Sequence, residues 1–153
     1  MGSAGSLLQS YLTTRYEVYG STPRERFTLR IGQREPKLAA LHARKRVRCS
    51  AFITAWHPRS IVRAPSLNRV AQAKLLRDLR LLGCIVVPGQ GIGTDGQWRE
   101  PSVLALGLRR MDAKRLALRY GQNAAVVCDI RAIPQLLLVR PLLGAASQPI
   151  QAA

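Results

Sequence analysis

The stretch SLNRVAQAKLLRDLRLLGCIVV, residues 66–87, contains the signals that decide the fold class. Ser66 is a suitable N-cap and Gly83 suits a left-handed C-cap, so the sequence predicts a helix from Ser66 to Leu82. The short apolar run at 84–87 that follows predicts a strand. A helix that leads directly into a strand indicates that the chain combines both kinds of element.

The predicted helix has an apolar face and a basic face, as expected of a helix that covers a core. The apolar face comprises Leu67, Ala71, Leu75, Leu79 and Leu82. The opposite face carries Arg69, Arg77 and Arg80. We expect this helix to pack on a sheet and to present its arginines to solvent or to a polyanion.

Further elements are predicted on both sides of this stretch. Alternating or β-branched apolar runs predict strands at 27–31, 47–56, 103–108, 124–130 and 136–139. A short helix is expected at 7–14, and 36–44 is either a helical turn or a loop. The Gly-rich residues 88–96 join two predicted strands, which indicates a hairpin with a long tip.

A second amphipathic helix is predicted from Asp112, as its cap, to Tyr120, and Gly121 ends it. Its inward residues are Ala113, Leu116, Ala117 and Tyr120. Its outward residues are Arg115 and Arg119. The fold class is therefore α/β of the mixed α+β type, with a mixed sheet covered by helices. One layered domain is expected over residues 7–143, with frayed termini at 1–6 and 144–153.

The chain is strongly basic, with 24 Lys and Arg against 8 Asp and Glu and a formal net charge of +16. Such a charge favours nucleic acid or another polyanion as a partner. Because most of these cations are arginines, two explanations stay open. Arginine suits bidentate phosphate recognition, and GC-rich codons also enrich a protein in arginine. The residues expected to contact nucleic acid are Arg69, Arg77, Arg80, Arg115 and Arg119.

Several classes of protein are not indicated. The first eleven residues lack the basic region of a secretory signal, and no apolar run approaches the roughly 20 residues of a membrane span. Three widely spaced cysteines and two histidines form no zinc-site spacing, so no metal site or cofactor is predicted, and a cytoplasmic location fits best. Gly91, Gly93 and Gly96 match a dinucleotide-binding spacing, but no helix follows them, which favours a flexible hairpin tip.

The candidate site residues each have a structural alternative. His57 is a possible general base or anion ligand, or a solvated loop histidine. Glu100 is a possible general acid or base, or a salt-bridge partner among many arginines. Trp98 is a possible stacking surface or a loop anchor. Asn68 and Gln122 are amides at helix ends, where backbone capping is the usual role.

The order and spacing of several segments resemble the bacterial family called domain of unknown function 3293. The resemblance extends from about Tyr11 to Leu138. It rests on residues 14–16, 30–32 and 51–56, on Asn68 with its helix, on Trp98, Glu100 and Ser102, and on residues 120–122. In most of the family, asparagine stands at the position of His57. The resemblance implies no reaction, but it implies that Thr54, Asn68, Trp98, Glu100 and Gln122 belong together in one pocket.

Three hypotheses follow for the function. The first is a nucleic-acid-binding module that uses the arginine faces of the two helices. The second is an enzyme or ligand-binding domain for a small phosphorylated or nucleotide-like compound. It would use Glu100 as acid or base, with Thr54, His57, Asn68 and Gln122 as positioning groups. The third is an adaptor without chemistry, which an exposed apolar patch would favour.

Overall fold

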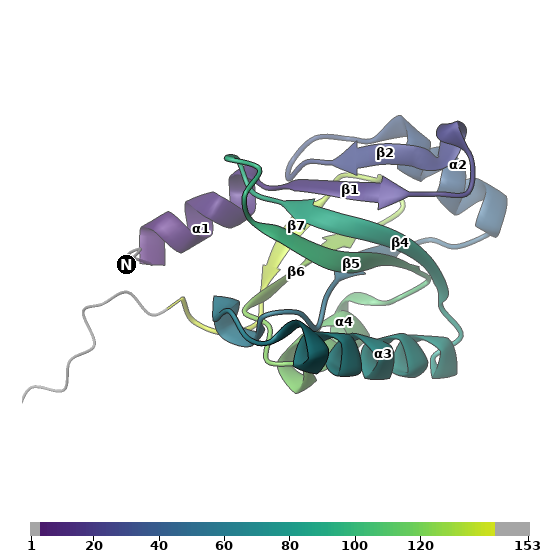
Figure 1. The fold of residues 1–153 in the computed structure, drawn as a ribbon. Coiled ribbons are helices and arrows are strands. Elements are labelled where there is room, and N and C mark those ends of the chain that lie inside the picture. Colours follow the sequence, from purple (N-terminus) through teal and green to yellow (C-terminus); the bar gives the residue numbers. More distant parts are fainter. Residues whose placement is uncertain (1–3, 143–153) are drawn as a thin grey trace, which may run out of the picture.

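The computed structural model of the chain describes residues 4–142 (Figure 1). Frayed termini are predicted at 1–6 and 144–153; residues 1–3 and 143–153 lie outside the described residues, and residues 4–6 are helical. The first helix, α1, spans Ala4–Thr13 and lies beside the end of the sheet. No helix between residues 4 and 142 has the length and apolarity that crossing a membrane requires.

The described residues form one sheet of seven strands. In chain order the strands are β1 Arg15–Tyr19, β2 Arg26–Leu29, β3 Ser50–Ile53, β4 Ile85–Ile92, β5 Arg99–Leu106, β6 Ala124–Cys128 and β7 Gln135–Leu138. Their order in the sheet is β2-β1-β4-β5-β3-β6-β7, and every described pairing is antiparallel. The remaining elements are α2 Pro36–Lys45, α3 Pro65–Leu81, α4 Arg110–Arg119 and two 3-10 turns, η1 Pro23–Glu25 and η2 Pro58–Ser60.

The predicted mixed α+β class is confirmed, and the sheet within it is antiparallel throughout its described pairings. The predicted mixed sheet would contain parallel neighbours, and this part of the prediction is wrong, because the six pairings of the described strands are all antiparallel. Strands β3 and β4 do run in the same direction, but β5 lies between them and pairs antiparallel with both. Because β5 of the β4–β5 hairpin separates β3 from β4, these two strands do not pair and the sheet remains antiparallel.

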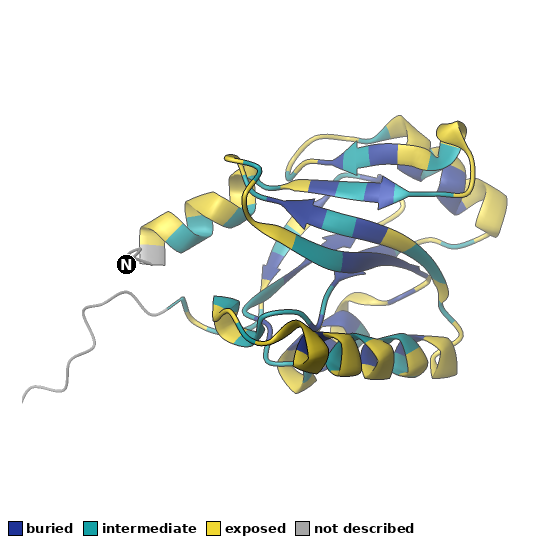
Figure 2. Cartoon of the chain, in the orientation of Figure 1, coloured by how far each residue is buried: buried dark blue, intermediate teal, exposed yellow. Residues whose placement is uncertain are grey.

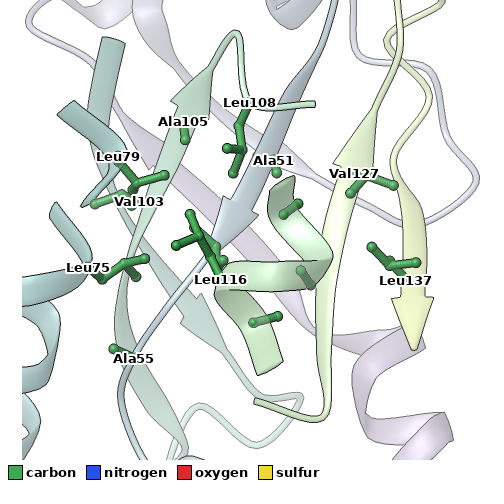
Figure 3. Packing of buried hydrophobic residues seen from close by; sticks show 14 residues of the cluster. Ala51, Ala55, Leu75, Leu79, Val103, Ala105, Leu108, Leu116, Val127 and Leu137 are labelled. Carbon is green, nitrogen blue, oxygen red and sulfur yellow. The ribbon is translucent and has the colours of Figure 1, made fainter. Parts of the chain in front are cut away.

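The two faces of the sheet bury two apolar clusters. Helices α3 and α4 cover one face, where Leu75, Leu79 and Leu116 pack on Ala51 and other small side chains of the strands (Figure 3). Helix α2 covers part of the other face, where its leucines pack with Phe52 and neighbouring side chains. Strand β3 supplies both clusters because successive side chains of a strand alternate between faces. Figure 2 shows the burial along the sheet and on the inward side of α3.

Helix α3 differs from the sequence prediction at its two ends. It begins at Pro65, with Ala64 as its N-cap and no side-chain cap bond, so the predicted capping role of Ser66 is wrong. Leu67 and Leu82, predicted on the apolar face, are 57% and 52% exposed. Asn68, the next residue, is buried instead of Leu67, because its side-chain amide forms hydrogen bonds with the loop that precedes the helix. Gly83 has φ +77° and ends the helix as predicted.

The predicted β4–β5 hairpin is confirmed, with a shorter tip than residues 88–96. Strand β4 continues to Ile92, which pairs with Arg99. Gly89 lies in this strand. A Cβ at this position would lie 2.5 Å from the Glu17 carbonyl oxygen and 2.8 Å from Phe52 Cε2. Glycine is thus required there for close strand packing, not for a flexible loop.

The ends of other elements also differ from the prediction. Strand β1 was missed, although Tyr16 and Val18 alternate with polar residues and both are buried. Helix α4 begins at Arg110 without a side-chain cap, so the predicted capping role of Asp112 is wrong. Asp112 lies in the first turn and pairs with Arg109 at 3.0 Å. The open alternative at 36–44 is resolved as a helix, α2.

Candidate ligand pocket

A cavity of about 470 Å³ lies at the end of the sheet nearest α1. Helix α1 forms one wall, and η2 and the tip of the β4–β5 hairpin form parts of the rim. The ends of strands β1, β3, β5 and β6 supply the remaining walls. The apolar part of the lining includes Phe52, Val126 and Leu136. The cavity is thus a recess inside the curled sheet, at the opposite end from α2.

A glycine in the middle of a cross-strand row opens this cavity. Tyr16 pairs with Gly91, and Gly91 pairs in turn with Glu100. Directly paired residues of an antiparallel sheet place their side chains on the same face. A Cβ on Gly91 would meet only Thr14 Cγ2, at 3.9 Å. The missing side chain therefore leaves space between Tyr16 and Glu100, and all three residues line the cavity.

Glu100 is the principal titratable group of the cavity. Burial raises the pKa of its carboxyl to about 7, and a hydrogen bond with the Trp98 side chain acts in the opposite direction. Neither lysine nor arginine is among the lining residues. Within residues 4–142, Glu100 has no ion-pair partner, so the salt-bridge alternative finds no support. A carboxyl in this setting is able to exchange a proton with a ligand near neutral pH.

Thr54 and Gln122 line the same cavity and also fix its wall. The Thr54 hydroxyl donates to the Pro101 carbonyl at 2.7 Å and accepts from the Trp56 amide at 3.0 Å. Gln122 Nε2 donates to the Trp56 carbonyl at 3.0 Å. Gln122 Oε1 makes no hydrogen bond with another described residue, so it is available as an acceptor for a ligand.

Trp98 lines the cavity, and His57 lies behind it. The ring centroids of His57 and Trp98 are 5.2 Å apart. His57 Nδ1 accepts hydrogen bonds from the Arg63 amide and from Asn68 Nδ2, both at 3.2 Å. Burial lowers the pKa of His57, and the charge of Arg63 lowers it further. His57 is thus a neutral ring with one nitrogen already engaged, and it is not among the residues that line the cavity.

Asn68 lies outside the cavity lining and is fully buried. Its Oδ1 accepts from the His57 amide at 3.0 Å and from Arg63 Nε at 2.8 Å. Its Nδ2 also donates to the Arg63 carbonyl at 3.3 Å. Asn68 therefore anchors the loop between β3 and α3 and supports the cavity indirectly.

The five arginines predicted to contact nucleic acid are all exposed. Arg69, Arg77 and Arg80 belong to α3, and Arg115 and Arg119 belong to α4. Both helices cover the same face of the sheet (Figure 1). Arg119 pairs with Asp78 at 3.2 Å and Arg115 with Asp112 at 3.5 Å, so part of this charge is neutralised. None of the five lines the cavity.

Sequence reasoning missed Tyr16, Gly91 and the residues of α1 as parts of the site. The Tyr16 hydroxyl donates to the Tyr11 carbonyl at 2.6 Å, which ties β1 to the end of α1. The Tyr11 hydroxyl in turn lies 3.0 Å from Ser60 Oγ in η2. The alternation around Tyr16 was a usable signal for a strand. The contact between α1 and η2 spans 49 residues and has no local signal.

The fold and the cavity together define a small antiparallel α+β domain in which a recess at one end of the sheet holds a half-buried carboxyl. Residues 53–125 match the model of a family described as "Protein of unknown function (DUF3293)". The predicted resemblance is thus confirmed over this range, which includes the candidate site residues Thr54, His57, Asn68, Trp98, Glu100 and Gln122. No curated protein and no solved structure gives a match.

Proposed function

We propose that the cavity binds a small organic molecule, either uncharged or amine-bearing, and that Glu100 shares or exchanges a proton with it. The observation that supports this proposal is a half-buried carboxyl that lines a cavity of about 470 Å³ and has no ion-pair partner within residues 4–142. Pockets of about 300–1,000 Å³ are typical of small-molecule sites. Thr54, Trp98 and Gln122, predicted from the sequence as ligand-binding residues, line the same space.

The charge of the lining narrows the class of ligand. Glu100 and Asp95 line the cavity, whereas neither lysine nor arginine does. A phosphate placed between two carboxyls would be repelled. The proposed ligand therefore has hydroxyl or amine groups instead of the phosphate expected from the sequence.

The chemistry available to Glu100 extends from binding to catalysis. Because its pKa is about 7, protonated and ionised forms coexist at neutral pH. The protonated form donates a hydrogen bond to a ligand hydroxyl, and the ionised form accepts a proton from one. Gln122 Oε1 is a second point for fixing the ligand. The same arrangement thus serves a binding protein or a general acid–base enzyme.

The experiment is a ligand screen with a pair of matched glycine variants. A panel of sugars, polyols and primary amines is tested by thermal shift and calorimetry against wild type, Gly91→Ala and Gly91→Val. The valine side chain extends into the cavity, and we expect it to weaken binding at least tenfold, whereas alanine retains binding. Wild type and Gly91→Val binding the same compounds equally well would contradict the proposal. Circular dichroism checks that both variants are folded.

We propose polyanion binding by α3 and α4 as a second function. The supporting observation is that Arg69, Arg77 and Arg80 are exposed on a helix that shares its sheet face with α4. Nucleic-acid affinity of this kind falls steeply with salt because counterions are released. Fluorescence anisotropy with single- and double-stranded DNA, at 50 and 200 mM salt, tests it. Affinity that stays constant between these salt concentrations would exclude this function.

We also propose that the domain works in a reducing compartment such as the cytoplasm. Cys49, Cys84 and Cys128 are all free thiols. Burial raises the pKa of each thiol, and that of Cys128 reaches about 12, which keeps them protonated and unreactive. Thiol titration of the protein purified without reductant tests this point. The expected result is three titratable thiols after unfolding.

A further inference from the structure

A second hollow, separate from the cavity, is also lined by residues of η2. This groove, of about 560 Å³, is formed by η2, the first half of α3 and the end of α4. Four of its lining residues are cations, Arg59, Arg63, Lys74 and Arg119. None of its lining residues is acidic. The groove and the cavity share no lining residue. The charged residues that line the groove are all basic, whereas those that line the cavity are all acidic.

Two of the four cations are held in place by the fold. Arg63 is half-buried, and its Nε donates to Asn68 Oδ1 at 2.8 Å. Its Nη2 also contacts two main-chain carbonyls at 3.4 Å. Arg119 is held by Asp78 at 3.2 Å. Such fixed guanidinium groups lose little conformational entropy when they bind an anion.

The other two cations have no ion pair in the described part of the chain. Arg59 and Lys74 face the groove from η2 and α3, respectively. Asp78, through Arg119, is thus the one carboxylate of residues 4–142 that is ion-paired with this set. The four cations repel one another, and a single carboxylate offsets only part of this repulsion. An anion bound in the groove relieves the rest.

The turn that carries Arg59 has an unusual backbone. His57, Arg59 and Ser60 have φ values of 43°, 57° and 60°, in the left-handed region that favours glycine. Each such residue costs about 1 kcal/mol or more, and strain of this kind clusters at functional sites. The turn is held because the Arg59 amide donates to the Gly121 carbonyl at 2.8 Å. The strained turn thus places Arg59 in the groove.

The uncharged part of the groove indicates that the anion is attached to an organic group. Leu67 and Val70 line it and are 57% and 56% exposed. Tyr120 also contributes to the lining. Inorganic phosphate has no apolar surface to bury against these side chains, whereas a phosphate ester buries part of its organic group against them. Arginine guanidinium groups match phosphate oxygens in bidentate geometry.

We propose that this basic groove, formed by Arg59, Arg63, Lys74 and Arg119, binds the phosphate group of a phosphate ester. The ester is either a small phosphorylated metabolite or one unit of a nucleic-acid backbone, which share the same phosphate chemistry. The groove proposal does not depend on the ligand of the cavity, since the two sites have separate linings. It also differs from general attraction to the arginine faces of α3 and α4, because it requires this particular set of side chains.

The experiment measures the binding of three probes to ¹⁵N-labelled protein by NMR and calorimetry. The probes are inorganic phosphate, adenosine monophosphate and a single-stranded DNA hexamer. We expect the amide signals of Arg59 and Gly121 to shift on binding. The double variant Arg59→Gln/Lys74→Gln should weaken binding at least tenfold. The matched control Arg34→Gln/Lys45→Gln removes the same two charges from exposed positions before and at the end of α2, outside the groove lining, and should change affinity less than twofold.

Each outcome has a defined meaning. Binding of adenosine monophosphate that is lost in the groove variant supports the proposal and assigns the site to small phosphate esters. Binding of the DNA hexamer alone, with the same loss, supports it and assigns the site to a nucleic-acid backbone. The absence of binding by all three probes at millimolar concentration overturns it. Equal losses in the groove variant and the control also overturn it, because the attraction is then general.

Discussion

The Tyr120 hydroxyl donates to Asp78 Oδ2 at 2.5 Å and thereby joins the end of α4 to the last turn of α3. The two residues are 42 positions apart in the sequence. This hydrogen bond is the largest cause of the lowered pKa of Asp78, and Arg119 lowers it further. The pair therefore stabilises the folded state through the ionised form of the aspartate.

Tyr120→Phe is expected to destabilise the protein by about 1–2 kcal/mol at pH 7, because the variant lacks a hydrogen bond to a charged acceptor. The pKa of Asp78 lies below its ordinary value of 3.8 in the folded state. Its contribution to stability is thus present above pH 3.8 and is lost as the pH falls through the folded-state value. Urea unfolding at pH 7 and pH 3 measures the difference. The gap between wild type and variant should narrow at pH 3, and an unchanged gap would count against this account.

The pH dependence due to Glu100 has the opposite sign. Its folded-state pKa is raised from 4.5 to about 7, so the folded protein favours the protonated carboxyl. Its contribution is fully present below pH 4.5 and is lost as the pH rises through about 7, by at most about 3 kcal/mol. Glu100→Gln removes this dependence. Urea unfolding from pH 4.5 to 7.5 should therefore show wild type losing stability relative to the variant.

The control for Glu100 is Asp95→Asn, which removes an exposed carboxylate from the rim of the same cavity. It should leave the decline of wild-type stability between pH 4.5 and 7.5 in place. If Glu100→Gln retains the same pH dependence as wild type, the pKa of the Glu100 carboxyl is not raised in the folded state.

Local periodicity predicted the parts of the fold that depend on local spacing. Leu75 and Leu79 are buried as predicted, because residues four positions apart lie on the same face of a helix and this face packs on the sheet. Leu67 was predicted on the same stripe, but Asn68 is buried in its place. The reason is that Asn68 Oδ1 accepts hydrogen bonds from the His57 amide and from Arg63 Nε, which helical periodicity does not encode.

The candidate site was predictable only in part for a similar reason. Thr54, Glu100 and Gln122 were predicted as one group, and the structure brings them to one cavity. That grouping came from the family resemblance and not from spacing. Tyr16 and Gly91 were missed because their part in the site depends on the register of β1, β4 and β5. Strand order and register are set by contacts between residues distant in the sequence.

Two alanine variants in α3 compare Ser66, which the sequence predicts as the N-cap, with Asn68, which forms the hydrogen bonds to the preceding loop. Ser66→Ala should change the free energy of unfolding by less than about 0.5 kcal/mol, because Ser66 is exposed and makes no cap bond. Asn68→Ala should cost about 2–4 kcal/mol, because it leaves the His57 amide and Arg63 Nε without an acceptor in the loop. Urea unfolding at pH 7 measures both. A larger effect at Ser66 than at Asn68 would contradict the hydrogen-bond assignment.

Two glycines of β4 provide the sharpest test of the cavity itself. A Cβ on Gly89 would lie 2.5 Å from the Glu17 carbonyl oxygen, so Gly89→Ala forces the strands apart and should cost about 1–3 kcal/mol. A Cβ on Gly91 would meet only Thr14 Cγ2, at 3.9 Å. Gly91→Ala should therefore be neutral or stabilising by up to about 1 kcal/mol, because alanine restricts the unfolded chain. Thermal and urea unfolding of the two variants give the comparison. Equal destabilisation at both positions would mean that the space between Tyr16 and Glu100 is filled, and the proposed ligand site would be lost with it.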